Sequence, residues 1–209
     1  MLSHMSSVKK ILPVLICLAM LAGGAVLYVQ DASAQAPGVP AAAAPEVSAA
    51  PAPPKIDSGD TAWVLVSTAL VLAMTAPGVM LFYGGMVRSK NAMDTIMQSF
   101  IILCLISIQW VLWGYSLAFG PDKGHIIGGP EWFGLNGVGL EPNADYAATI
   151  PHQAFMLFQM MFAVITPALI TGAFAERIKF KSFLLFTLLW ATFVYDPLAH
   201  WVWGVGGWI

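Results

Sequence analysis

Charged side chains are scarce in this 209-residue sequence, and their scarcity excludes most classes of water-soluble protein. Asp, Glu, Lys and Arg together make up 10% of the residues, while 58% are hydrophobic. A soluble globular domain carries about 25% charged residues, so this chain has too few to present a polar surface to water. Most of it must be surrounded by lipid, and we expect a membrane protein in contact with a bilayer.

Basic residues and cysteines are also few, which removes further classes of function. The net charge is −2, so no basic surface is available to meet phosphates, and nucleic acid is excluded as a partner. The two cysteines, Cys17 and Cys104, lie in separate apolar runs, which argues against an intrachain disulfide or a zinc site. The sequence has no nucleophile–base pair, metal cluster or phosphate-binding loop, so we expect neither a cofactor nor an enzyme.

Two segments precede the membrane region. Residues 1–34 have the pattern of a secretory signal peptide, with two lysines before an apolar run that begins at Ile11 and a small-residue cleavage sequence that ends at Ala34. An uncleaved membrane anchor is the alternative, because the apolar run is long for a signal peptide. Residues 35–59 are rich in Ala and Pro and are predicted to form a disordered linker.

Long apolar runs are what the sequence has in abundance. A helix needs about 20 residues to cross the hydrocarbon core of a bilayer, and four runs reach that length: 61–87, 95–121, 146–175 and 182–203. Helices satisfy all their backbone hydrogen bonds within one segment, as a chain in lipid requires. Residues 60–209 are therefore predicted to form an all-α membrane protein with four transmembrane helices.

The loops between these runs differ in charge. The first loop contains Arg88 and Lys90 and the third contains Arg177, Lys179 and Lys181, whereas the longer middle loop has one lysine and four acidic residues. Lys and Arg accumulate on the cytoplasmic side of membrane proteins. We therefore expect the basic loops in the cytoplasm, the middle loop and the mature N-terminus outside, and the chain in the cell (inner) membrane.

Aromatic and polar side chains mark the third run. Phe155, Phe158 and Phe162 are spaced by three and four residues and so share a helical face, with Gln159 beside them and a kink expected at Pro167. Lipid-facing or interhelical packing explains most phenylalanines in a membrane helix. Gln159 argues against that explanation here, because an amide in lipid needs a partner or a cavity.

The fourth run ends in tryptophans and a histidine. Trp201 and Trp203 fit the aromatic belt found at lipid–water interfaces, while a cation site is the alternative, because a desolvated cation over a tryptophan face gains about 2 kcal/mol. Asp196 and His200 lie four residues apart. They are close enough to interact within one helical turn, and we expect them to be near enough to the surface to be solvated.

Four strings occur in order along this region: TAPGVMLFYGGMVRSKN, WVLWGYSLAFG, FQMMFAVITPALITGAFAERIKF and AHWVWG. Each string alone is moderately specific, but four in register are very specific. Together, from Asp60 to Ile209, they resemble the ammonium transporter (Amt) family, which is related to the Rhesus proteins. The resemblance implies a homotrimer with eleven spans in each subunit, arranged as two inverted five-helix repeats and one further helix. The four helices of this chain would form most of the first repeat.

The resemblance also implies a function and a substrate site. It implies transport of ammonium or ammonia, with methylammonium as an analogue, in which ammonium is recruited at an aromatic outer vestibule and deprotonated before an apolar pore. In the family pattern Phe162 corresponds to the vestibule aromatic, Phe158 lies one turn deeper on the same helix, and Trp203 corresponds to the vestibule tryptophan. We expect these three residues to bind substrate, while Trp201 and Trp208 remain in the interfacial belt.

The resemblance is incomplete at the C-terminal side. The family's fifth span, second repeat, pore histidines and second gate phenylalanine would all follow Ile209, and neither His152 nor His200 corresponds to the pore histidines. We therefore expect a truncated gene product or a partial sequence that is inactive alone. An ammonium sensor built on the same fold and an inert membrane fragment are the alternatives.

Overall fold

Asp57 marks the point where extended chain gives way to the first membrane helix. The computed structural model describes residues 55–209, so the predicted signal peptide and most of the predicted linker lie outside the described residues. Asp57 is extended, and its Oδ1 accepts a hydrogen bond of 2.9 Å from the Asp60 backbone N–H, which caps the first turn of α2 (Ser58–Ala73). Helix α2 therefore begins just inside the range predicted as linker.

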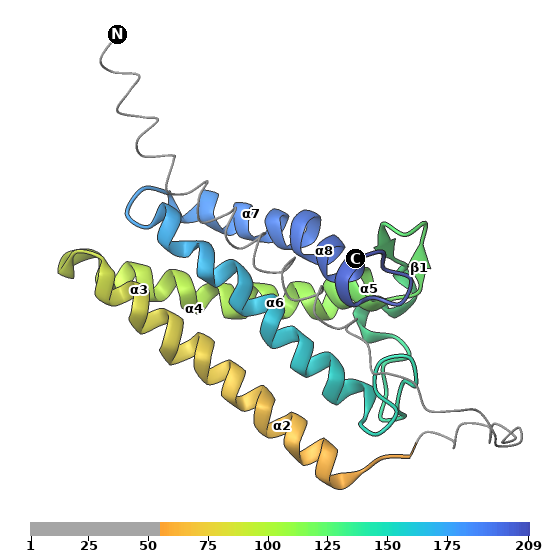
Figure 1. Cartoon of the computed structure of the whole chain (residues 1–209). Helices are drawn as coiled ribbons and strands as arrows, with labels where there is room; N and C mark the ends of the chain where they lie inside the picture. Colours follow the sequence, from red (N-terminus) through yellow and green to blue (C-terminus); the bar gives the residue numbers. More distant parts are fainter. Residues whose placement is uncertain (1–54) are drawn as a thin grey trace, which may run out of the picture. The chain divides into compact units, whose positions relative to one another are not determined.

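Four helices of the described chain are long and apolar enough to cross a membrane (Figure 1). They run over Ser58–Met86, Ser89–Phe119, His152–Phe174 and Phe180–Trp203. The predicted four-helix architecture is confirmed, but two helices begin six residues away from their predicted starts. The second begins at Ser89 rather than Thr95. The third helix begins at His152 rather than Tyr146, because the residue before Pro151 is pushed away from helical conformation by the proline ring.

Three of these four helices contain a π-helical segment, in which an extra residue is wound into the turn. The first continues from α2 through η2 (Met74–Val79) into α3 (Met80–Met86). The second comprises the 3₁₀ turn η3 (Ser89–Asn91), α4 (Ala92–Gln109), the π segment η4 (Trp110–Gly114) and α5 (Tyr115–Phe119). The fourth comprises α7 (Phe180–Trp190), the π segment η6 (Ala191–Tyr195) and α8 (Asp196–Trp203). The third is the single helix α6 (His152–Phe174), which continues through Pro167.

The long loop between α5 and α6 folds back onto α5. It contains the antiparallel strands β1 (Asp122–Lys123) and β2 (Ile127–Gly128), followed by the 3₁₀ segment η5 (Pro130–Leu135). A Cβ atom at Gly128 would lie 2.4 Å from the Ser116 carbonyl oxygen, so only glycine lets β2 approach the helix this closely. The Ser116 hydroxyl donates a 2.6 Å hydrogen bond to the Gly129 carbonyl, which fixes the loop on the helix.

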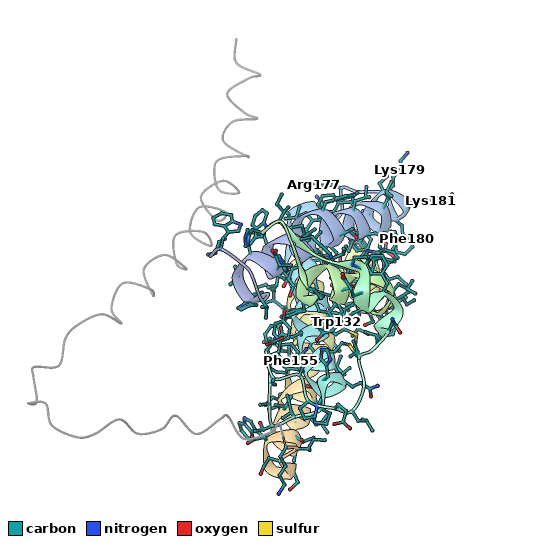
Figure 2. All side chains as sticks on the ribbon, turned by 90° about the vertical axis from the view of Figure 1, so that its right-hand side faces the viewer. Trp132, Phe155, Arg177, Lys179, Phe180 and Lys181 are labelled. Carbon is teal, nitrogen blue, oxygen red and sulfur yellow. The ribbon has the colours of Figure 1, made fainter. Side chains whose placement is uncertain are left out.

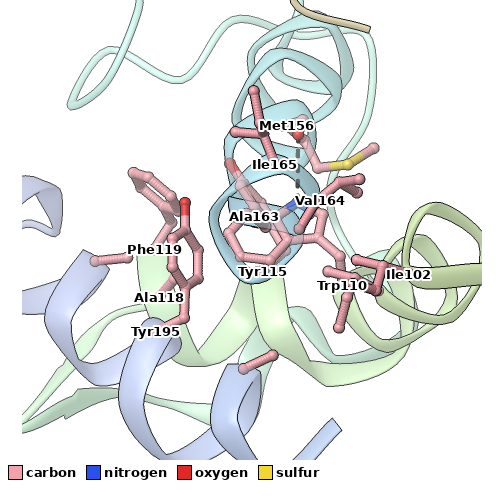
Figure 3. Close-up of a cluster of buried hydrophobic side chains, with 14 of the residues drawn as sticks. Ile102, Trp110, Tyr115, Ala118, Phe119, Met156, Ala163, Val164, Ile165 and Tyr195 are labelled. Carbon is pink, nitrogen blue, oxygen red and sulfur yellow. Dashed lines mark hydrogen bonds between the residues drawn. The ribbon is translucent and has the colours of Figure 1, made fainter. Parts of the chain in front are cut away.

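Large aromatic side chains fill the core beneath this loop (Figure 3). The fully buried Trp110 lies against Tyr115 and Phe119, with ring centroids 5.8 and 6.1 Å apart, and its Nε1 donates to the Met156 carbonyl of α6 at 3.4 Å. Half (50%) of the most apolar stretch of α6 is buried, against 22% for the first helix. Helix α6 is therefore the central helix, and the first helix lies at the periphery.

The bundle has two chemically distinct ends. Figure 1 shows the α3–α4 and α6–α7 connections together at one end, which we call the basic end because it carries the five basic residues of the two short loops. The opposite end holds the α5–α6 loop and residues 204–209, and we call it the loop end. In Figure 2 the basic side chains of Arg177, Lys179 and Lys181 lie apart from Trp132 and Phe155 of the loop end. The charge asymmetry seen in the sequence thus corresponds to the two ends of one bundle.

Glu176 joins the two connections of the basic end. Its Oε1 accepts hydrogen bonds from the Arg88 backbone N–H at 3.1 Å and from Asn91 Nδ2 at 2.9 Å. These bonds hold the pKa of the Glu176 carboxyl below its usual value, and the bond from Asn91 has the largest effect. The backbone of Glu176 is left-handed, with φ of +65°, a conformation that costs a residue with a side chain some strain.

Candidate functional site

The two phenylalanines predicted to bind substrate meet on α6. Phe158 and Phe162 are one turn apart and partly buried, and their rings pack edge to face with centroids 5.1 Å apart. Helix α6 begins at the loop end with His152, so Phe158 lies nearer that end than Phe162 does. With the loop end outside, as the charge pattern predicts, this order is the reverse of the one that the family pattern implies, in which Phe158 lies one turn deeper than Phe162.

Phe155 does not belong to this pair, although sequence spacing placed it on the same face. Its ring stacks on Tyr146 at 5.2 Å and meets Phe119 edge-on at 5.4 Å, so it is part of the aromatic packing at the loop end. Gln159 is partly buried, and within residues 55–209 its amide makes no hydrogen bond. Its amide is therefore without a partner among the described residues.

Trp203 is exposed, whereas its neighbour Trp201 is fixed. Trp203 is the last residue of α8 and has 56% of its surface exposed. Trp201 donates from Nε1 to the Ile126 carbonyl at 2.7 Å, and its ring lies 5.6 Å from that of Trp208. In the described chain Trp203 makes no aromatic contact with either α6 phenylalanine. The aromatic surface of Trp203 is thus available to another molecule, while Trp201 holds the chain end to the loop.

His200 and Asp196 are both fully buried, which contradicts the expectation that they are solvated. They also bind different partners rather than each other. His200 Nε2 lies 3.0 Å from Asp122 Oδ1 of β1, and its Nδ1 lies 3.1 Å from the Ala118 carbonyl of α5. Asp196 Oδ2 accepts a 2.7 Å hydrogen bond from Gln109 Nε2 at the end of α4. Helical spacing placed the two side chains on one face but gave no sign of the distant groups that bind them.

The two bonds of His200 fix the orientation of its ring. A carbonyl oxygen only accepts hydrogen bonds, so the bond to Ala118 requires a proton on Nδ1. The other ring nitrogen, Nε2, faces the Asp122 carboxyl. The hydrogen bond from His200 is the main reason that the pKa of the Asp122 carboxyl lies below its usual value, and the His125 backbone N–H, 2.9 Å away, adds to the effect.

Gly204 allows this arrangement at the base of Trp203. A Cβ atom at position 204 would lie 2.5 Å from His200 Nδ1 and 3.0 Å from the Ala118 carbonyl oxygen. The glycine of the AHWVWG string is therefore explained by the close approach of the chain to the histidine ring. Across residues 55–209, no three His, Cys, Asp or Glu side chains are grouped to hold a metal ion. The loop end offers aromatic faces, the contact between His200 and Asp122, and a surface ion pair between Lys123 and Glu131.

Comparison with known proteins gives a consistent result. A sequence model of the Ammonium Transporter Family matches residues 62–209. The chain is similar to the ammonium transporter of Bacillus subtilis, with 60% identity over 72% of this chain and 36% of that protein. It is also similar to the ammonium transporter of Mycobacterium tuberculosis, with 49% identity over 73% of this chain and 36% of that protein. The chain thus spans about a third of the length of these relatives.

Solved structures share the fold. The crystal structure of Candida albicans Mep2 matches with a TM-score of 0.66 and 35% identity over 73% of this chain and 33% of that one. A structure described as a sensor Amt protein matches with a TM-score of 0.65 and 27% identity over 71% of this chain and 36% of that one. The resemblance predicted from the four strings is confirmed, and the chain is a multi-pass membrane protein that belongs to the ammonium transporter family.

Proposed function

We propose that this chain contributes to the transport of ammonium or ammonia across a membrane, in a homotrimeric assembly like that of the full-length family. The family match over residues 62–209 carries the proposal. The paired rings of Phe158 and Phe162 and the exposed Trp203 support it, since the resemblance to the family implies an outer vestibule at Phe162 and Trp203.

The mechanism follows from the cost of moving a charge into an apolar pore. An ammonium ion over the face of Trp203 or Phe162 gains about 2 kcal/mol once water is removed, which is enough to concentrate it at the mouth. Complete burial of the bare ion costs far more than this. The cation is therefore held at the aromatic surface, gives its proton to water there, and continues as neutral ammonia. Methylammonium, which is larger by one methyl group, serves as the measurable analogue.

The proposed location is the inner membrane of the cell. In the proposed orientation the loop end lies outside and the basic end lies in the cytoplasm. The separation of Arg88 and Lys90 from the acidic loop supports it. A phosphatase reporter, active only outside the cytoplasm, is expected to be inactive when fused after Lys90 and active when fused after Gly137. The opposite pattern would reverse the orientation.

Trp203 and Trp201 provide a matched pair for testing the site. A transport assay needs both walls of the pore, so residues 60–209 would replace the matching part of the Bacillus subtilis relative, to which they are 60% identical. In this hybrid, Trp203→Leu is expected to raise the methylammonium concentration that gives half-maximal uptake about tenfold. A change of this size corresponds to losing more than 1 kcal/mol of cation binding. Trp201→Leu is expected to leave half-saturation unchanged and to lower the amount of folded protein.

Equal effects of the two substitutions on the half-saturation concentration would show that Trp203 is an interfacial belt residue and does not bind the cation. The 209-residue chain expressed alone is the second control, because its aromatic surface would face lipid or another copy rather than a second pore wall. We expect no methylammonium uptake from it above empty vector, in cells without other ammonium transporters. Uptake comparable to that of the hybrid would contradict the proposed two-walled pore.

Ammonium sensing is the second candidate function, favoured by the similarity to the sensor Amt protein at 27% identity. The relative at 60% identity is an ammonium transporter, and we therefore place transport first.

A further inference from the structure

The interior of the bundle holds an acidic residue for which the transport proposal has no use. Asp196 is the first residue of α8 and Gln109 is the last residue of α4, and both are buried, with 0% and 1% of their surfaces exposed. The amide Nε2 of Gln109 donates to Asp196 Oδ2 at 2.7 Å. No salt bridge reaches Asp196 within residues 55–209. His200, one turn further along α8, is engaged with Asp122 and Ala118 instead.

The remaining oxygens of this pair lack partners. Asp196 Oδ1 and Gln109 Oε1 are two of the four buried side-chain oxygens of the described chain without a hydrogen bond. Both are acceptors when Asp196 is ionised, so neither can satisfy the other. A single proton on Asp196 Oδ1 would turn that atom into a donor, and the amide oxygen of its existing partner is the matching acceptor.

The orientation of the glutamine amide supports this arrangement. Nε2 has two N–H groups, and they reach Asp196 Oδ2 and the Thr192 hydroxyl oxygen, which lies 3.5 Å away and also accepts from Trp113 Nε1 at 3.0 Å. The nitrogen therefore faces the two acceptors, and Oε1 is the amide atom left over. Gly114 leaves room for the amide, because a Cβ atom there would lie 2.7 Å from Nε2 and 2.8 Å from Oε1.

Two alternatives to a proton fit less well. An ionised carboxylate inside a membrane helix bundle, with no cation beside it, is strongly disfavoured. A bound metal ion would need several ligands, but no three His, Cys, Asp or Glu side chains of residues 55–209 are grouped to hold one. A proton needs no cavity and satisfies both oxygens at once.

We propose that Asp196 is a proton-binding residue, held as a neutral acid, which forms a cyclic pair of two hydrogen bonds with the amide of Gln109. The pair links the second and fourth membrane helices inside the bundle. It also lies where the π segments η4 and η6 meet α4 and α8, and π segments often accompany functional positions because the extra residue re-aims the neighbouring side chains. This inference does not depend on the transport proposal.

Infrared spectroscopy of the 209-residue chain in detergent tests the proposal directly. A protonated carboxyl has a C=O stretching band that an ionised carboxylate lacks. At neutral pH we expect this band in the wild-type chain and its loss in Asp196→Asn, with a shift of the band in Gln109→Leu as the amide partner is removed. Asp122→Asn, which removes the surface aspartate that His200 keeps ionised, is the matched control and should leave the band unchanged.

Heat unfolding of the same variants gives an independent readout. Asparagine at position 196 preserves two hydrogen bonds to the glutamine amide, so Asp196→Asn should unfold near the wild-type temperature, whereas Asp196→Leu should unfold well below it. The absence of the infrared band from the wild-type chain would overturn the proposal. So would a wild-type unfolding temperature that rises with added potassium, sodium or ammonium while Asp196→Asn no longer responds, because that result indicates a cation site.

Discussion

The two ends of the bundle are closed by hydrogen bonds of similar length in very different surroundings. At the loop end, the fully buried His200 joins α8, α5 and β1 through bonds of 3.1 and 3.0 Å. At the basic end, Glu176 joins two turns at the surface through bonds of 3.1 and 2.9 Å. Water competes for the bonds of Glu176 but has little access to those of His200. Burial, rather than bond geometry, should therefore make the loop end the more firmly held of the two.

Removal of the buried histidine should have the largest effect on this comparison. His200→Leu removes the hydrogen bond from the ring to the Ala118 carbonyl in the interior and takes the ring nitrogen away from Asp122. We expect the free energy of unfolding to fall by about 2 kcal/mol or more, measured by tryptophan fluorescence of the chain in detergent. Leu198→Ala, at an exposed position of the same helix, is the control. An effect of His200→Leu no larger than that of the control would remove the distinction between the ends.

Acid should weaken both ends through their carboxylates. Hydrogen bonds, from His200 to Asp122 and from Asn91 to Glu176, lower the pKa values of these groups in the folded chain. A carboxyl with a lowered folded pKa stabilises the fold above its unfolded pKa of about 4, and the contribution is lost as the pH falls through the folded value. The unfolding temperature should be nearly constant from about pH 7 to pH 5 and fall below about pH 4.

Hydrogen exchange locates this acid effect. In acid, the backbone amides of residues 122–128 should exchange faster than the pH dependence of the intrinsic exchange rate predicts. Asp122→Asn should remove that excess. An acid response of this loop that persists in Asp122→Asn would assign it to another group.

Glu176→Gln should have the smallest effect. Glutamine retains an oxygen that can accept from Asn91 and loses only a charge at the surface, where water and salt screen it. We expect a shift of unfolding temperature smaller than that of His200→Leu, with the difference between wild type and variant shrinking further in high salt. A loss as large as that of His200→Leu would show that the basic end is held as firmly as the loop end.

Composition and periodicity predicted much of this molecule. Apolar run length located all four membrane helices, since the need to satisfy the backbone in lipid leaves few other solutions. Lys and Arg in the short loops predicted that the two turns share one end. The start of the third helix was placed too early, because Tyr146 and the residues after it are apolar enough for a helix but pack as a loop, where the Tyr146 hydroxyl donates to the Phe119 carbonyl.

Long-range polar pairs were beyond the reach of sequence spacing. His200 binds a carboxylate 78 positions earlier, and Asp196 binds an amide 87 positions earlier. A helical projection shows only near neighbours. It therefore suggested that the two side chains contact each other and solvent. The three proposed substrate residues, Phe158, Phe162 and Trp203, were chosen from motif register, and they stay predictions until transport is measured. Their surroundings sharpen the choice, because Trp201 is fixed by a hydrogen bond and Trp203 is exposed.

The peripheral position of the first helix has a consequence for biosynthesis. The α3 part of the first membrane helix meets α4, which follows it directly, but the α2 part packs against α6, which begins about 80 residues after α2 ends. At ordinary rates of translation, α2 therefore waits on the order of ten seconds for α6. It is suited to that interval, because the hydroxyls of Thr68 and Thr75 donate to carbonyls one turn earlier in their own helix, at 2.7 and 3.2 Å. A newly inserted first helix therefore leaves neither hydroxyl proton unpaired in lipid before the rest of the bundle exists.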